Sequence, residues 1–283
     1  MNHGIRLFIV LGLLSSTLSS QHKSTLGDNA ALRYYAAFSV MQDSTVSDTE
    51  ARKLIGILDG TAPYDDLQYK ILVKGNLPAL ELMTLGASHD DCDWGLEYQL
   101  RDQVPVEYAR KALQLGRLNV LYAFHLSITG DKDGAVRTLA AGMRFSRDVA
   151  NGGSLFAALV AKQLLVEHLR AGEGLLHIAG LSQAQRAVLR GAVEQISSRN
   201  IDWQTTIQRE LRIIGKPDQQ GVLRQIAREY SAALKDPSLL GEVEASTSKL
   251  APDLQALIPN PKRVTEEKQD LESRIQQARK AMQ

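Results

Sequence analysis

The sequence has one cysteine, few aromatic residues and almost no net charge. With Cys92 as the only cysteine, the chain cannot form an internal disulfide. We expect this thiol to be buried and inert, and the alternatives are a reactive thiol or an intermolecular bridge. Aromatic residues make up 5% of the chain, which argues against a stacking surface for sugars or bases. The 33 basic and 32 acidic side chains leave a formal charge of +1, so the composition predicts no nucleic-acid partner.

Common catalytic and cofactor-binding motifs are also missing. The chain contains no G-x-S-x-G, H-E-x-x-H or G-x-G-x-x-G sequence and no P-loop. His125 and His168 lie among leucines in predicted helices, a position more typical of a hydrogen-bonded core histidine than of a ligand. The sequence therefore predicts a protein that is not an enzyme and that uses no cofactor.

Residues 1–19 have the composition of a secretory signal peptide. Arg6 supplies a positive charge, residues 7–14 are apolar, and residues 15–20 are small and polar, with the cleavage site predicted after Ser19. The apolar run is too short to span a membrane, and no later stretch approaches the ~20 apolar residues that a span requires. We therefore expect an exported protein, periplasmic or extracellular, without a transmembrane segment in its mature chain.

The mature chain reads as a series of helices separated by short turns. Apolar residues recur at the three-four spacing of helix faces, and glycine, proline or asparagine marks the breaks between them. No segment alternates apolar and polar residues as a strand does, so we expect no sheet and about ten to twelve antiparallel helices. The predicted organisation is a flexible lead-in, a helical domain, a proline-rich linker and a polar C-terminal helix, at residues 20–28, 29–258, 259–263 and 264–283.

Three consecutive helices, predicted at residues 106–128, 134–148 and 154–170, form the centre of this arrangement. The first is apolar over more than half of its circumference, so neighbouring helices must cover it on two sides. The residues around the turn that follows it resemble the turn and second helix of a tetratricopeptide hairpin, at Leu126, Gly130, Asp131, Ala135 and Leu139. A strict repeat of about 34 residues is absent. The predicted fold is all-α, with stacked antiparallel hairpins in a tetratricopeptide-like or irregular α-solenoid or bundle.

Local signals also predict the boundaries and faces of other helices. Residues 171–174, with the sequence Ala-Gly-Glu-Gly, are predicted to form the turn that ends the third central helix. The polar C-terminal helix carries one narrow apolar stripe, and we expect it to dock onto the body of the protein. A helix capped by Asp28 or Asn29 is predicted near the N-terminus. Its inward residues are expected to be Leu32, Tyr35, Ala36 and Val40.

The segment SHDDCDWG, residues 88–95, concentrates potential metal ligands. Its aspartates are also what the N-terminus of a helix prefers, and we interpret the segment as a loop that caps a helix beginning near Trp94. In that interpretation the indole packs the loop against the core. The alternative is a hydrolase or metal-dependent enzyme that uses His89 with Asp91 or Asp93, since histidine and carboxylate groups bind divalent metals.

The chain resembles a group of exported, all-helical bacterial proteins of unassigned function. The resemblance is carried by Asn29-Ala30-Ala31 with Tyr34-Tyr35, by Cys92-Asp93-Trp94-Gly95, and by the Gly130-Asp131 turn with the Arg144 to Asp148 stretch. It implies a helical fold from Asn29 to Met282. It implies no activity, because the group has none assigned.

The sequence favours a binding or scaffold protein of the cell envelope with a protein or peptide partner. Stacked helical hairpins form concave surfaces that bind such partners. Arg110, Gln114 and Arg117 share one face of the first central helix, and the two arginines are candidates to bind a carboxylate of a partner peptide. The alternative is that these arginines pair with nearby acids such as Asp102 or Glu107 at the surface.

Overall fold

The computed structural model describes residues 28–42, 48–58, 61–97, 107–178 and 180–283. Within these ranges the fold is all-α, with thirteen α-helices and no β-strand, so the predicted fold class is confirmed. One isolated bridge joins Asn29 to Asp91. No helix in the same ranges has both the length and the apolar composition to cross a bilayer. The predicted signal peptide, residues 1–19, lies outside the described part.

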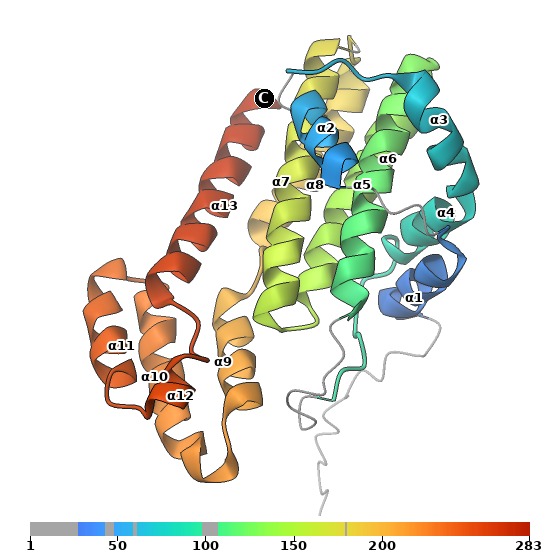
Figure 1. Cartoon of the computed structure of the whole chain (residues 1–283). Coiled ribbons are helices and arrows are strands. Elements are labelled where there is room, and N and C mark those ends of the chain that lie inside the picture. The colour runs from blue at the N-terminus through green and yellow to red at the C-terminus, as the bar shows by residue number, and fades with distance from the viewer. Residues whose placement is uncertain (1–27, 43–47, 59–60, 98–106, 179) are drawn as a thin grey trace, which may run out of the picture.

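Eight helices form a main bundle (Figure 1). The helices α5, α6 and α7 pack on one another, α4 and α8 both pack on α6, and α1 pairs with α4. This arrangement covers α5 on more than one side, as its broad apolar surface predicts. The bounds are α1 Ala30–Val40, α2 Asp48–Leu58, α3 Asp66–Gly75, α4 Leu77–Gly86, α5 Glu107–Ile128, α6 Lys132–Ala150, α7 Leu155–Ile178 and α8 Gln183–Ser198.

The turn between α5 and α6 forms as the sequence predicts. Gly130 adopts a positive φ of 94°, which glycine tolerates without steric cost. The Asp131 side chain then accepts a hydrogen bond from the Gly134 N–H at 2.7 Å and caps α6. Earlier in the chain, within α5, Gly116 lets this helix approach α7, because a Cβ at that position would lie 2.5 Å from a methyl carbon of Leu164.

The predicted turn at residues 171–174 is wrong. α7 continues through this segment to Ile178, and the chain turns instead at Gly180, where φ is +55°. Gly172 serves the packing of the helix, because a Cβ there would lie 3.1 Å from the terminal methyl of Met282, the C-cap of α13 (Pro261–Ala281). A glycine inside a helix therefore marks a close helix–helix approach in this case, and the local sequence does not distinguish the two roles.

Four further helices form a lower lobe, below and to one side of the main bundle in Figure 1. α9 begins at Trp203 with its N-cap at Asp202, whose side chain accepts from the Thr205 N–H. The polypeptide then returns to the main bundle through α13, which begins at Pro261, so the predicted linker at 259–263 is shorter than expected. The bounds of the lobe are α9 Trp203–Ile214, α10 Gln220–Ala233, α11 Leu240–Thr247 and α12 Pro252–Gln255.

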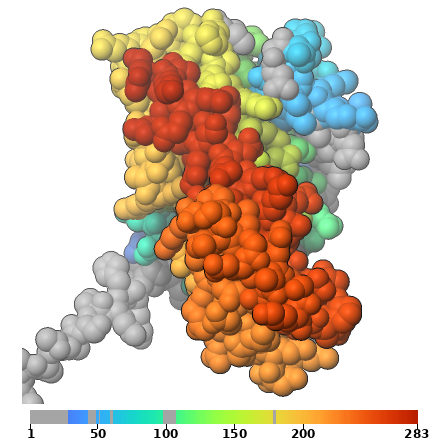
Figure 2. Space-filling view, turned by 90° about the vertical axis from the view of Figure 1, so that its left-hand side faces the viewer, coloured from blue at the N-terminus to red at the C-terminus, as the bar shows by residue number. Residues whose placement is uncertain are grey.

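The C-terminal helix α13 docks onto α7 and α8, which confirms the predicted docking (Figure 2). Ion pairs join the helices, with 2.7 Å between Lys162 Nζ and Glu267 Oε2 and 2.9 Å between Arg279 Nε and Glu194 Oε1. The apolar stripe of α13 is buried at Val264, Leu271, Ile275, Ala278 and Met282.

Candidate functional site

The segment after α4 is not the start of a helix. Residues 91–97 are non-helical, so the predicted helix near Trp94 is wrong for this stretch. The backbone groups of the segment bond instead to the beginning of α1. The Ala30 N–H donates to the Asp91 carbonyl at 2.8 Å, and the Asn29 side-chain amide exchanges two hydrogen bonds with the Asp93 backbone. The aspartates therefore belong to a loop that closes on another helix, 60 residues earlier in the chain.

This loop is anchored to the C-terminal end of α6. The Trp94 Nε1–H donates to the Asp148 carbonyl at 2.8 Å, and the Tyr108 hydroxyl donates to the Val149 carbonyl at 3.2 Å. The same two carbonyls also accept from the Asn151 and Gly152 N–H groups, at 3.1 and 3.4 Å, so each side chain adds a second donor at the end of α6. Trp94 is buried, as predicted, and its ring stacks on Tyr108 with centroids 4.3 Å apart. Cys92 is only partly buried, and burial raises the pKa of its thiol well above the usual range.

The face that α1 turns to the protein differs from the predicted one. Leu32, Tyr35 and Val40 are exposed, whereas Tyr34 is completely buried and packs closely against Gly86 of α4. The predicted inward face of α1 is therefore wrong. Tyr34 lies on the buried face with Ala37 and Phe38, and its hydroxyl donates to the carboxylate of Asp148 on α6 at 2.8 Å.

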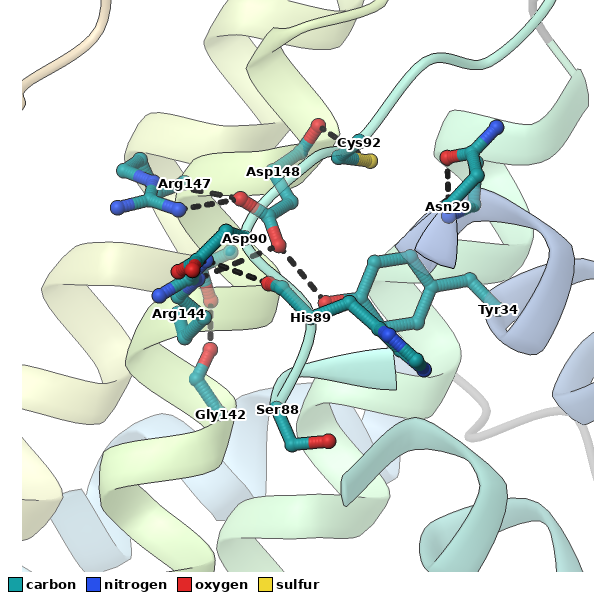
Figure 3. Close-up of polar contacts among 12 residues, drawn as sticks. Asn29, Tyr34, Ser88, His89, Asp90, Cys92, Gly142, Arg144, Arg147 and Asp148 are labelled. Atoms are coloured by element: carbon teal, nitrogen blue, oxygen red, sulfur yellow. Dashed lines mark hydrogen bonds and ion pairs between the residues drawn. The ribbon is translucent and has the colours of Figure 1, made fainter. Parts of the chain in front are cut away.

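Asp148 is the centre of a group of four side chains, which we call the Asp148 cluster: Tyr34, Arg144, Arg147 and Asp148 (Figure 3). Arg147 donates from Nη2 to Asp148 Oδ1 at 2.7 Å and from Nε to the same oxygen at 3.3 Å. Arg144 Nε lies 3.8 Å from Asp148 Oδ2. Burial raises the pKa of the Asp148 carboxyl, against the lowering effect of Arg147 and of the Tyr34 hydroxyl.

The Asp148 cluster contains more buried positive charge than negative charge. Two guanidinium groups face one buried carboxylate, and either protonation state of Asp148 leaves at least one cation in excess. The only other acid paired with them among the described residues is Asp90, 3.4 Å from Arg144, and its side chain is 93% exposed to water. An exposed carboxylate is strongly screened and compensates little of the buried charge. Arg144 Nε is buried and makes no hydrogen bond within the described part of the chain.

An open groove of about 410 Å³ runs over the side of α6 between α4 and α8, and we call it the α4–α8 groove. A recess of about 10 Å³, lined by Arg144 and Arg147 among others, shares much of its wall with this groove. The two arginines are the only charged side chains along both, as far as the described residues show. The groove lining consists of Thr84, Ala87, Ser88, Ala140, Ala141, Arg144, Ala187, Val188, Gly191, Ala192 and Gln195.

A second set of buried polar side chains joins α5, α6 and α7, and we call it the core network: Arg117, Asn119, Ser146, Glu167 and His168. Arg117 donates twice from Nε and once from Nη2 to the Glu167 carboxylate, at 3.1 to 3.3 Å. His168 is fully buried, with Nδ1 2.7 Å from the Leu164 carbonyl and Nε2 3.1 Å from the Asn119 amide. Burial lowers the pKa of His168 to about 4, so the ring is neutral near pH 7.

The neutral ring of His168 fixes the hydrogen bonds around it. Nδ1 carries the proton, because its close neighbour is the Leu164 carbonyl, which can only accept. Nε2 is then an acceptor, whereas the structure places Asn119 Oδ1 3.1 Å from it. Rotating the Asn119 amide by 180° places its NH2 group at Nε2 and gives a partner to the amide nitrogen, which has none among the described residues in the present orientation.

The proposed metal ligands of the loop do not converge. The His89 carbonyl accepts a hydrogen bond from Arg144 Nη2, and His89 Nε2 is buried without a partner among the described residues. Asp91 and Asp93 are exposed, and Asp93 Oδ1 accepts from the Gly95 N–H at 2.9 Å. Throughout the described ranges, no group of three or more histidine, cysteine or acidic side chains is placed to hold a metal ion.

The three candidate partner-binding residues of α5 lie in different environments. Arg110 is exposed and lies 3.7 Å from Glu107, one of the acids that the alternative interpretation names. Gln114 is half-buried. The Arg117 side chain is only 11% exposed and is bonded to Glu167 in the core network. Arg117 therefore has a structural partner already, and the α4–α8 groove contains none of the three residues.

Sequence reasoning did not assign a role to Arg144, Arg147 and Asp148. The available signal was three charged residues within five positions of an otherwise apolar helix segment, where Phe145 and Val149 are buried. Charged residues at buried helix positions are rare unless they are paired. That pattern indicates an ion-pair cluster, although it does not identify Tyr34 as a member.

Comparison of the chain with protein-family models, with curated proteins and with solved structures finds no match. The resemblance to exported helical proteins therefore stays a prediction. Three of the segments that carry it meet around the Asp148 cluster: Asn29 to Tyr35 in α1, Cys92 to Gly95 in the loop, and Arg144 to Asp148 in α6. The function has to be inferred from the geometry of this region.

Proposed function

We propose that this protein binds a peptide segment of a partner protein in the α4–α8 groove. The observation that carries the proposal is the groove itself, an open volume of about 410 Å³ between three packed helices. Grooves between helices are a recurrent mode of peptide recognition, in which apolar side chains provide affinity and a few polar groups provide orientation. The class of function is thus a binding or scaffold protein.

The lining of the groove supports a polypeptide ligand. Ala140 and Ala141 form the part contributed by α6, and Ala187, Gly191 and Ala192 form the side contributed by α8. Small residues let another backbone approach closely, as they do between packed helices. Gly191 contributes open space, because a Cβ at that position would meet no atom within 4 Å. The hydroxyl and amide groups of the lining can bond to a peptide backbone.

The composition of residues 1–19 supports a location outside the cytoplasm. The partner of the groove is then a protein of the cell envelope or the surrounding medium. This part of the proposal rests on the sequence alone. Fractionation of cells that produce the full chain, with immunodetection of the shortened mature form, would test it, and a full-length product confined to the cytoplasm would contradict it.

Binding in the groove is tested by a variant that fills it. Peptides of about 16 residues, roughly 24 Å long as helices, are selected from a random display library against the full chain. Gly191→Trp places an indole in the groove, and we expect it to abolish binding of the selected peptides. Gly221→Trp is the matched control, since Gly221 lies outside the groove lining and also has no atom within 4 Å of a Cβ. Equal loss in both variants, or loss in neither, contradicts the proposal.

A further inference from the structure

We propose that the α4–α8 groove recognises an acidic side chain, aspartate or glutamate, of its peptide partner and seats its carboxylate between Arg144 and Arg147. This inference rests on the proposed peptide binding and names the chemistry that selects the peptide. The groove supplies contact area through small apolar residues. The two arginines supply the only charge along it within the described residues.

The charge balance of the site calls for an anion. Arg144 and Arg147 together face one buried carboxylate, that of Asp148, and one screened carboxylate, that of Asp90. Burying a guanidinium group without an equivalent counter-charge is costly, and an anionic group of a ligand removes that cost when it binds. Because water can reach the open groove, the excess charge is tolerated in the unbound protein.

The donors that such a carboxylate needs are present. Arg144 bonds through Nη2 and Arg147 through Nε and Nη2, so the Nη1 group of each arginine makes no hydrogen bond among the described residues. A guanidinium group has five N–H donors in a fixed planar arrangement, which matches the two oxygens of a carboxylate. Asp148 and the Tyr34 hydroxyl fix the position of Arg147 before the ligand arrives. Such preorganised donors favour recognition because little ordering remains to be done on binding.

The shape of the site points to a side chain and not to a chain terminus. The recess lies against α6 and α8, with Ala140 and Ala192 in its wall, and it shares these residues with the side of the groove. Its volume of about 10 Å³ corresponds to about one water molecule. A peptide that lies along the groove can place one oxygen of a side-chain carboxylate in this space, with the rest of the carboxylate in the groove beside Arg144, while its backbone continues on both sides.

The first test uses changes in the peptide, which leave the fold of the protein untouched. Among peptides selected by the full chain, we expect aspartate or glutamate at one fixed position flanked by apolar residues. Replacing that acid by its amide should weaken binding about 10- to 100-fold, the range expected for a charge-assisted hydrogen bond. Amidation of the peptide C-terminus should leave binding unchanged. If amidation abolishes binding while the side-chain change does not, the ligand is a terminal carboxylate and the inference is overturned.

The second test assigns the acid to Arg144. Arg144→Gln should weaken binding of the acidic peptide about 10- to 100-fold. The amide peptide has already lost its interaction with Arg144, so it should bind wild type and Arg144→Gln equally. Arg110→Gln is the matched control, since it removes the same charge from an exposed arginine outside the groove, and we expect unchanged binding. If Arg144→Gln unfolds, Arg144→Lys keeps the charge, and we expect it to retain the preference for the acid over the amide.

The outcomes separate this inference from the proposed function. Loss of binding in Gly191→Trp without any preference for an acid supports the groove and overturns the role of the arginines. An unchanged preference for the acid in Arg144→Gln also overturns it. Peptides that bind Gly191→Trp as they bind wild type, or a library that yields no peptide sensitive to this variant, overturn both.

Discussion

The core network and the Asp148 cluster are two sets of buried polar side chains that share the helix α6 but differ in charge and access. In the core network, one arginine faces one carboxylate, Arg117 and Glu167, with side chains 11% and 7% exposed. In the Asp148 cluster, two arginines face one carboxylate, Asp148, that is 1% exposed. The core network is balanced and enclosed by three helices, whereas the cluster has excess positive charge beside an open groove.

This difference indicates separate roles for the two sets. A network with balanced charge fixes the relative positions of helices, and its charges need no counter-ion from outside the chain. A cluster with unused donors and excess charge is complete only when another group joins it. Burial of charge alone does not identify a binding site in this protein. The criterion is the combination of excess charge with an open path to it.

The largest effect is expected when the carboxylate is removed from each set. Asp148→Asn leaves Arg147 without a carboxylate and Arg144 with only the exposed Asp90, and we expect it to lower the free energy of unfolding by about 3–5 kcal/mol. Glu167→Gln leaves one arginine, Arg117, which keeps the neutral amide of the new side chain as a hydrogen-bond partner, so the expected loss is about 1–3 kcal/mol. Urea-unfolding curves of the two variants give this comparison. A larger loss for Glu167→Gln would show that the core network, and not the cluster, carries the greater electrostatic strain.

The stability of the protein should depend on pH through His168 of the core network. His168 has a pKa of about 4 in the folded protein, against about 6.5 in an unfolded chain, because burial disfavours its charged form. The folded state therefore binds fewer protons between these values, and stability falls as the pH falls from about 6.5 toward 4. The expected loss over that window is about 3 kcal/mol.

Unfolding free energies measured from pH 7 to pH 4 for wild type and His168→Gln test this expectation. The variant should lose the part of the slope that comes from the ring. His177→Gln is the control, since His177 is exposed, and it should keep the wild-type slope. A slope that survives in His168→Gln would assign the pH dependence to other groups.

Much of the fold was predictable because its signals are local. The bounds of α9, Trp203–Ile214, follow from local residues, because an aspartate cap precedes the helix and a Gly-Lys-Pro sequence follows it. Ser182 and Gln185 form the reciprocal hydrogen bonds of a capping box at the start of α8. Such signals depend on residues three or four positions apart, which a sequence displays directly.

The site was not predictable because its contacts are long-range. Tyr34 and Asp148 are 114 positions apart, and no periodicity in either helix indicates that they meet. The buried face of α1, with Ala30, Tyr34 and Ala37, has the three-four spacing of a helix face, but the sequence offers a second apolar stripe beside it and does not show which one turns inward. The same limit applies to Gly172, whose role depends on Met282 at the other end of the chain. Tertiary contacts decided each of these positions against the local signal.

A smaller effect on stability is expected from the hydrogen bond by which Trp94 anchors the loop after α4 to the end of α6. Trp94→Phe keeps an aromatic ring beside Tyr108 but removes the hydrogen bond to the Asp148 carbonyl. Trp203 is an informative control, since it is equally buried and its Nε1 has no acceptor among the described residues. Both variants lose indole packing, and we expect Trp94→Phe to cost about 1 kcal/mol more than Trp203→Phe, the usual contribution of one hydrogen bond.

Thermal or urea unfolding of these two tryptophan variants, measured side by side, gives the difference. Equal losses would mean that the Trp94 Nε1 hydrogen bond adds nothing to the anchoring of the loop. A greater loss for Trp203→Phe would reverse the comparison and place the more important indole in the lower lobe.

The last comparison adds one methyl group in the core network, at Gly142, and one in the α4–α8 groove, at Gly191. The change at Gly191 is expected to have the smallest effect and the opposite sign. A Cβ at Gly142 would lie 2.2 Å from His168 Nε2 in the enclosed core network, so Gly142→Ala should destabilise the protein by about 1–3 kcal/mol. A Cβ at Gly191 meets no atom within 4 Å, and alanine is the better helix former, so Gly191→Ala should stabilise by about 0.5–1 kcal/mol. Melting temperatures of the two variants test both signs. The fold does not require glycine at position 191. A Gly191→Ala variant that is more stable but binds the selected peptides more weakly would therefore show that this glycine serves peptide binding in the groove. Destabilisation by Gly191→Ala would instead mean that the α4–α8 groove is packed as closely as the core network. The contrast between an enclosed core network and an open Asp148 cluster would then not hold.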